Sequence, residues 1–94
     1  MRDPETELML RVAAGDDEAF EQLVVRMLPR LEGYFRRLGA DPARAEDCAQ
    51  EVLMKVYRAR ARYQARARFT TYLFHVARNH WIDRYRHERI NRRP

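Results

Sequence analysis

The sequence predicts an all-α protein, a compact bundle of about four helices forming one small domain. Apolar residues recur at helical spacing over long segments, and Pro, Gly and Asp residues separate these segments. No segment has the alternating pattern that is typical of strands. A length of 94 residues allows a single modest core but is short for an enzyme with a buried cleft, so a binding module is favoured.

The first helix is expected at about 4–14, with Asp3 as its N-cap and Gly15 as its stop. The second helix, at about 17–38, has a continuous apolar stripe on one face. Because the stripe keeps its phase on both sides of Pro29, we expect one slightly bent helix. The residues of the stripe are Phe20, Leu23, Val24, Met27, Leu28, Leu31, Tyr34, Phe35 and Leu38.

The third helix is expected at about 42–60, and its buried stripe includes the single cysteine as a small core residue. Residues 61–69 lose the helical periodicity and are expected to form a basic loop. The last helix is expected at about 70–90, capped by Thr70 or Thr71, with a buried first half and a solvated second half. The stripe of the third helix consists of Ala45, Cys48, Ala49, Val52, Leu53 and Val56.

The charge is strongly polarised along the chain. Residues 58–94 contain eleven arginines and two acids, whereas residues 1–57 contain twelve acids and eight bases. A local excess of this size is a better sign of a binding surface than the overall net charge of +5. Aromatic side chains lie among these arginines, a combination that is typical of surfaces that bind phosphates and unstacked bases. They are Tyr63, Phe69, Tyr72, Phe74, Trp81 and Tyr85. The polarity suggests two different partners.

The composition argues against several classes of protein. One cysteine excludes an internal disulfide framework, and no apolar run approaches the roughly 20 residues of a membrane span. Residues 1–10 contain no signal segment, so we expect a soluble cytoplasmic protein. No catalytic motif is present, and neither an enzyme nor a cofactor is expected. His80, Asp83 and His87 share a helix face, but a metal site is disfavoured because a fourth ligand is lacking and arginines surround them.

Two groups of side chains are candidate binding sites. Asp47, Gln50 and Glu51 fall at i, i+3 and i+4 opposite the apolar stripe, with Met54 one turn further on. Such a patch suits a partner that carries arginines, although a plain solvated face is the commoner meaning of this pattern. Asn79 lies among basic residues of the last helix and could pair with a base edge, although most helical asparagines are merely surface residues.

The segments 41–57 and 69–83 closely resemble conserved region 2 of bacterial RNA polymerase sigma factors of the extracytoplasmic-function group, in the sigma-70 family. The segment 15–24 is similar to the opening helix of that family, and the resemblance covers about residues 8–90. It implies that the whole chain is one sigma region 2 domain. Family members normally continue into region 4, a helix-turn-helix domain. We expect this sequence to be a shortened chain without region 4.

The resemblance also implies a role for each group. Asp47, Gln50, Glu51 and Met54 would bind the clamp helices of the polymerase beta-prime subunit. The loop would be the specificity loop, which takes up a flipped base of the single-stranded, non-template minus-ten element of promoter DNA. Melting would then be the capture of flipped bases, without covalent chemistry. The implied DNA-binding residues are Arg60, Arg62, Tyr63, Gln64, Arg66, Arg68, Phe69, Thr71, Tyr72, His75, Arg78, Asn79, His80 and Asp83.

Within this set, the resemblance places Tyr63 at the aromatic position of the pocket and Asn79 against the adjacent upstream base. Tyr72 stands where the family usually has Trp, and Ala65 where a loop Gly is common. The shape of the loop and its preferred base therefore stay open. An alternative function is a helical protein-interaction adaptor whose basic surface binds an acidic partner. Anti-sigma factors commonly hold these sigma factors, so both functions can belong to one surface.

Overall fold

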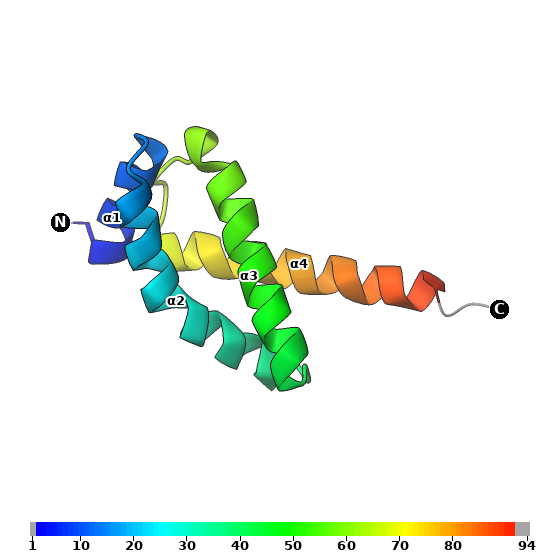
Figure 1. Ribbon diagram of the computed structural model, residues 1–94. Coiled ribbons are helices and arrows are strands. Elements are labelled where there is room, and N and C mark those ends of the chain that lie inside the picture. The colour runs from blue at the N-terminus through cyan, green and yellow to red at the C-terminus, as the bar shows by residue number, and fades with distance from the viewer. Residues whose placement is uncertain (1, 92–94) are drawn as a thin grey trace.

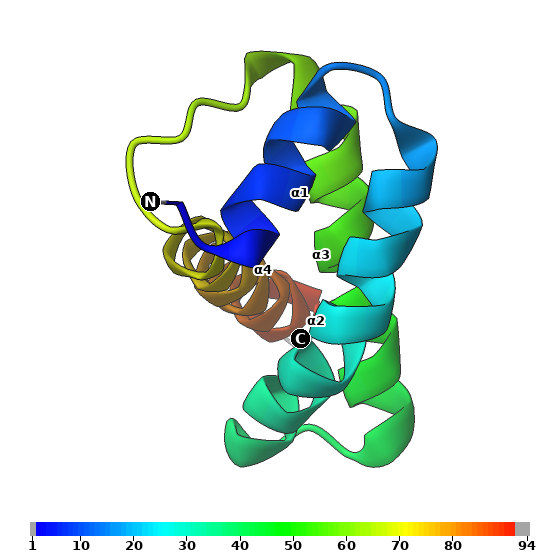
Figure 2. The same ribbon diagram turned by 90° about the vertical axis from the view of Figure 1, so that its left-hand side faces the viewer.

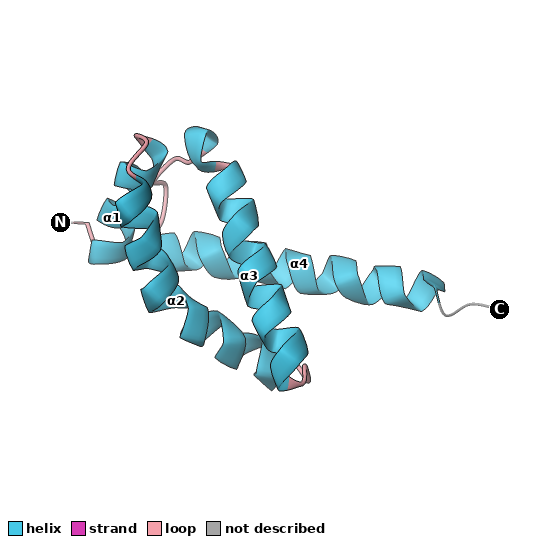
Figure 3. Ribbon diagram, in the orientation of Figure 1, coloured by secondary structure: helices cyan, strands magenta, loops and turns pink. Residues whose placement is uncertain are grey.

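The computed structural model describes residues 2–91 of the chain, with side chains described as far as Arg89. This part of the chain is helical and contains no strand, which confirms the predicted all-α class (Figure 3). None of its helices combines the length and the apolar character needed to cross a membrane. The elements are α1 (Pro4–Ala13), α2 (Asp17–Arg37), α3 (Pro42–Arg58), the short 3₁₀ helix η1 (Arg60–Arg62) and α4 (Phe69–Asn91).

The helices α1, α2 and α3 pack around the first half of α4, and the second half of α4 projects beyond them (Figure 1). Figure 2 looks nearly along α4 and shows the other three helices beside it. The projection makes the molecule elongated, with extents of 51 × 23 × 21 Å. The predicted change within α4, from a buried first half to a solvated second half, is therefore present. Its buried residues are Phe69, Leu73, Ala77 and His80.

The core lies where the apolar faces of the four helices meet. From α2 it receives Leu23, Met27, Leu31 and Phe35, at the helical spacing that predicted them. The prediction that Leu38 belongs to this stripe is wrong, since its side chain is 42% exposed at the C-cap of α2. Cys48 is fully buried, as expected. The remaining buried apolar residues are Leu8, Met9, Val12, Ala19, Ala40, Ala45, Ala49, Val52, Leu53, Val56, Phe69, Leu73 and Ala77.

Two glycines form the turns at either end of α2, and one proline lies within the helix. Gly15 and Gly39 have φ values of +103° and +106°, a conformation that other residues rarely adopt. Each follows a helix C-cap and turns the chain into the next helix. Pro29 lies inside α2, which continues from Asp17 to Arg37 as one helix.

The beginning of α4 differs from the expectation. The helix begins at Phe69, so Thr70 and Thr71 lie in its first turn, and the predicted threonine cap is wrong. A threonine from the other end of the chain satisfies the first amide instead, because Phe69 N donates to Thr6 Oγ1 at 2.9 Å. Thr6 is 3% exposed, and its hydroxyl donates to Asp3 Oδ2 at 2.8 Å. The N-terminal turn of α1 is thereby fixed to the start of α4.

The connection between α3 and α4 also differs from the expected loop at 61–69. The helix α3 ends at Arg58, and η1 takes up residues 60–62. The irregular connection is therefore confined to residues 63–68. The arginines at 66 and 68 lie within this short stretch, close to the helix that follows it.

His80 faces the core from α4, three residues after Ala77. It is 5% exposed, with its ring centroid 6.3 Å from that of Phe35. Its Nε2 atom is 2.8 Å from Glu51 Oε2, but the contact does not have hydrogen-bond geometry. Burial lowers the pKa of His80 below the ordinary value of 6.5, and this effect exceeds the opposing attraction of Glu51.

Substituting Thr6 by Val should test the link between α1 and α4. Valine keeps the shape but leaves the buried Phe69 amide without its acceptor, so we expect a loss of about 1–3 kcal/mol in the free energy of unfolding. Urea denaturation followed by circular dichroism measures this change. The exposed Thr71→Val change is the control, and we expect it to stay within about 0.5 kcal/mol of the wild type. Equal stability of the two variants would contradict the assigned role.

The ring of His80 should titrate below pH 6.5 in an NMR experiment, with its signal identified by its loss in His80→Gln. Since the folded pKa is lowered, the unfolded chain takes up this proton first on acidification. The contribution of His80 to stability is then complete above about pH 6.5 and is lost as the pH falls through the folded pKa. A midpoint above that of a histidine in an unfolded peptide would show instead that Glu51 outweighs burial.

Candidate nucleic-acid and protein interfaces

The connection at residues 63–68 passes beside the N-terminal turn of α1 before it enters α4 (Figure 2). The side chains of Gln64, Arg66 and Arg68 are exposed, whereas Tyr63 is turned inward. The backbone of the connection is itself turned, since Arg66 N donates to Gln64 O at 2.9 Å. The basic side chains are thus held at the surface while the preceding ring fixes the connection to the core.

Tyr63 belongs to an aromatic cluster with Phe69 and Tyr72. Its ring centroid lies 6.3 Å from that of Phe69 and 5.3 Å from that of Tyr72. Its hydroxyl is buried without a hydrogen-bond partner, and burial raises its pKa. The Tyr63 ring therefore packs beneath the connection and supports it. Only the exposed portion of the ring is available to stack on a base.

Four arginines between the end of α3 and the middle of α4 are candidates for binding phosphate groups. Within residues 2–89, none of Arg62, Arg66, Arg68 and Arg78 forms an ion pair, and all four are exposed. Arg60 is different, because its guanidinium donates to Tyr57 O at 2.9 Å and lies 4.0 Å from the Tyr57 ring centroid. Exposed arginines without ion pairs are suited to binding phosphate groups, and Arg66 and Arg68 line one cavity.

A row of exposed polar side chains on α4 lies after this connection. Thr71, His75, Arg78 and Asn79 are all exposed, and their spacing places them on one side of the helix. Asp83 is exposed one turn after Asn79, and Tyr72 is half-buried at the edge of the row. The amide of Asn79 is accessible to a ligand that also contacts the arginines.

Two residues expected to contact DNA are buried. Phe69 is 0% exposed and His80 is 5% exposed, on the core face of α4. Neither side chain can reach a nucleic acid in this structure, so both expectations are corrected. Helical spacing explains the result, since positions 69, 73, 77 and 80 follow one face. The described residues also contain no cluster suited to a metal ion.

The acidic group on α3 is not simply solvated, because it meets Arg84 of α4. Arg84 Nη1 donates to Asp47 Oδ2 at 3.2 Å and to Glu51 Oε2 at 2.8 Å. Partial burial would raise the pKa of Glu51, but the hydrogen bond and charge of Arg84, together with His80, lower it. Arg44 forms a further pair with Glu88 of α4. These pairs fix α4 across α3.

Gln50 and Met54 are the more accessible members of the same group. Gln50 is exposed, and its Nε2 atom donates to Glu46 Oε1 at 3.3 Å. Met54 is 44% exposed, which is unusual for so large an apolar side chain. The four residues on α3 thus lie on one surface. Its two carboxylates already pair with Arg84 of α4, whereas the Gln50 amide and the Met54 thioether are exposed to a partner.

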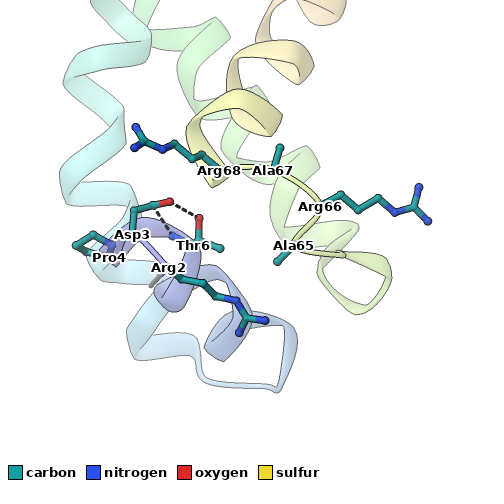
Figure 4. Close-up of a pocket in the computed structure, with 8 residues that line it drawn as sticks. All are labelled: Arg2, Asp3, Pro4, Thr6, Ala65, Arg66, Ala67 and Arg68. Atoms are coloured by element: carbon teal, nitrogen blue, oxygen red, sulfur yellow. Dashed lines mark hydrogen bonds between the residues drawn. The ribbon is translucent and has the colours of Figure 1, made fainter.

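A cavity of about 500 Å³ lies between the N-terminal turn of α1 and the connection (Figure 4). Sequence reasoning missed the contribution of α1 to it. The Asp3-x-x-Thr6 pattern indicates a helix cap, but it contains no information about what the cap faces. The cavity is lined by Arg2, Asp3, Pro4, Thr6, Ala65, Arg66, Ala67 and Arg68.

Comparisons of the sequence with known proteins identify its relatives. The RNA polymerase sigma factor CarQ of Myxococcus xanthus is 38% identical over 81 residues, which are 86% of this chain and 47% of CarQ. The ECF RNA polymerase sigma factor SigF of Caulobacter vibrioides is 36% identical over 94 residues, covering 96% of this chain and 52% of SigF. The ECF RNA polymerase sigma factor RpoE of Cereibacter sphaeroides is 33% identical over 75 residues, covering 79% and 41%.

The chain therefore spans about half the length of the curated relatives that it matches. No solved structure gives a significant match. The family model for sigma-70 region 2 matches residues 23–90, which is most of the chain. The chain belongs to the sigma-70 family, with its relatives in the extracytoplasmic-function group, and it contains region 2 of that family.

Proposed function

We propose that this chain is the domain of a transcription initiation factor that binds the RNA polymerase core and captures melted promoter DNA. The relatives are named as RNA polymerase sigma factors. The observation that carries the proposal is that η1, the connection and α4 present exposed arginines that form no ion pair among the described residues, namely Arg62, Arg66, Arg68 and Arg78. Such a surface binds the backbone of a single strand while the neighbouring polar groups contact its bases.

In this proposal, the minus-ten element of the non-template strand runs across the connection and along the exposed row of α4. The arginines neutralise its phosphates, and the Asn79 amide contacts a base edge. Stacking and phosphate contacts offset the unpairing of the duplex, since stacking stabilises by about 1–3 kcal/mol per base and flipping costs a few kcal/mol. The half-buried Tyr63 supports the connection and offers the exposed part of its ring to the flipped base.

The surface on α3 supports binding to the beta-prime clamp helices of the polymerase. Arg84 holds Asp47 and Glu51 in place through ion pairs, and each carboxylate has acceptor capacity left for an arginine of the partner. Gln50 and Met54 add an exposed amide and an exposed apolar group beside them. An interface with a central apolar group and charged neighbours is typical of specific protein association.

The DNA part of the proposal predicts a difference between two kinds of substitution. We expect Asn79→Ala to reduce discrimination among single-stranded minus-ten sequences by about 1–3 kcal/mol at one position. Arg66→Ala should instead weaken all sequences alike and reduce the dependence of log Kd on log salt by about 1. Fluorescence anisotropy with labelled oligonucleotides measures both effects.

Arg36→Ala, at the exposed end of α2 far along the chain from the connection, is the matched control and should change neither quantity. If the domain binds any duplex as tightly as single strands, and Asn79→Ala and Arg66→Ala have no effect, promoter capture is wrong. The adaptor function would then be the better explanation of the basic surface.

The polymerase part predicts that Gln50→Ala combined with Met54→Ala weakens binding to purified bacterial core polymerase by about 1 kcal/mol or more. The matched control is Gln22→Ala combined with Val25→Ala, which removes the same kinds of exposed groups from α2. A titration of the labelled domain with core polymerase gives both affinities. Equal losses in the two double variants would place the interface elsewhere.

A further inference from the structure

The cavity between α1 and the connection has two chemically different walls. One wall is the N-terminal turn with Asp3 and Thr6, and the other is the connection with Ala65 and Ala67. Figure 4 shows the long side chain of Arg66 directed away from the space between these walls, whereas Arg68 extends on the side of the N-terminal turn. The volume of about 500 Å³ falls within the roughly 300–1,000 Å³ of small-ligand sites.

The polar side-chain groups of the inner wall are not equally available to a ligand. The Thr6 hydroxyl donates its hydrogen to Asp3 Oδ2 and accepts from Phe69 N, so its donor is already used. Asp3 accepts one hydrogen bond at each carboxylate oxygen, from Thr6 N and from Thr6 Oγ1, and each oxygen retains a further lone pair. The wall therefore offers a ligand a charged acceptor.

The hydrogen bonds also hold the carboxylate in its charged state and in one orientation. The side-chain and backbone hydrogen bonds from Thr6 lower the pKa of Asp3. Because Thr6 is bonded to Phe69, the same contacts fix the position of Asp3 relative to the start of α4 and to the end of the connection. A pre-oriented acceptor of this kind can distinguish ligands without a rearrangement.

The charges around the cavity indicate which part of a nucleotide fits inside it. Asp3 is its one acidic group and repels a phosphate, whereas the three arginines that line it, at positions 2, 66 and 68, attract one. The small side chains of Ala65 and Ala67 leave room for a planar group between the walls. A nucleotide is thus expected to place its base inside the cavity and its phosphates among the arginines at the rim.

We propose that Asp3 is a specificity-determining residue that selects, within the bound single strand, a base with an exocyclic amino group. This inference rests on the proposed function, and it adds a residue outside the 23–90 segment that matches the family model. Adenine, cytosine and guanine each present an amino donor to the carboxylate. Thymine has none, and its ring N–H lies between two carbonyl oxygens that the carboxylate repels.

The test uses a ten-nucleotide oligo(dT) strand whose central nucleotide is dT, dC or 2-pyrimidinone deoxyriboside, which is cytosine without its amino group. The wild-type domain should bind the dC strand about tenfold more tightly than the other two, the effect of one hydrogen bond to a charged group. In Asp3→Asn this preference should disappear. Asparagine is as good an N-cap as aspartate, so the helix is retained.

Asp16→Asn is the matched control, because Asp16 caps α2 in the same way and does not line the cavity. It should keep the preference for dC. If wild type and Asp3→Asn bind single strands with the same order of bases, the role of Asp3 is overturned while the proposed function stands. If the wild type does not bind these single strands at all, the proposed function and the role of Asp3 both fail.

Discussion

The hydrogen bond from the Phe69 amide to the Thr6 hydroxyl is the contact on which the arrangement of the binding surface depends. It joins residues 63 positions apart and determines where α4 begins. The beginning of α4 in turn determines how far the connection after η1 must reach and where its arginines emerge. The Tyr63, Phe69 and Tyr72 cluster packs beneath the same junction. One buried polar contact thereby positions the cavity, the arginines and the exposed row of α4.

Ion pairing divides the arginines of the chain into two groups with different roles. Arg84 and Arg44 pair with acids across the interface of α3 and α4, and they hold these helices together. Arg66 and Arg68 have no such partner among the described residues, so their charge is available to a ligand. Folding thus uses some of the positive charge of the chain within the domain and leaves other arginines, including those of the connection, available to a ligand.

Much of the fold could be predicted because helical periodicity is a local property. The stripes of α2 and α3, the burial of Cys48 and the uninterrupted helix through Pro29 all follow from spacing alone. Contacts between distant segments could not be predicted, because a local sequence pattern does not indicate which distant residue a side chain will contact. Thr6 and Arg84 were missed for this reason. The burial of His80 was different, since its spacing from Ala77 already placed it on the core face.

Surface ion pairs, and no buried apolar side chains, hold the second half of α4 against α3, and this has a consequence for its dynamics. From Phe69 to His80 the helix is held by buried side chains, whereas residues 82–89 have none. The pairs of Arg84 with Asp47 and Glu51 and of Arg44 with Glu88 lie at the surface, where ion pairs stabilise little, so these turns open with a low free energy. The distal turns of α4 can therefore unwind and re-form while the core stays intact. A partner that binds the distal turns of α4 also has to hold them in the helical conformation.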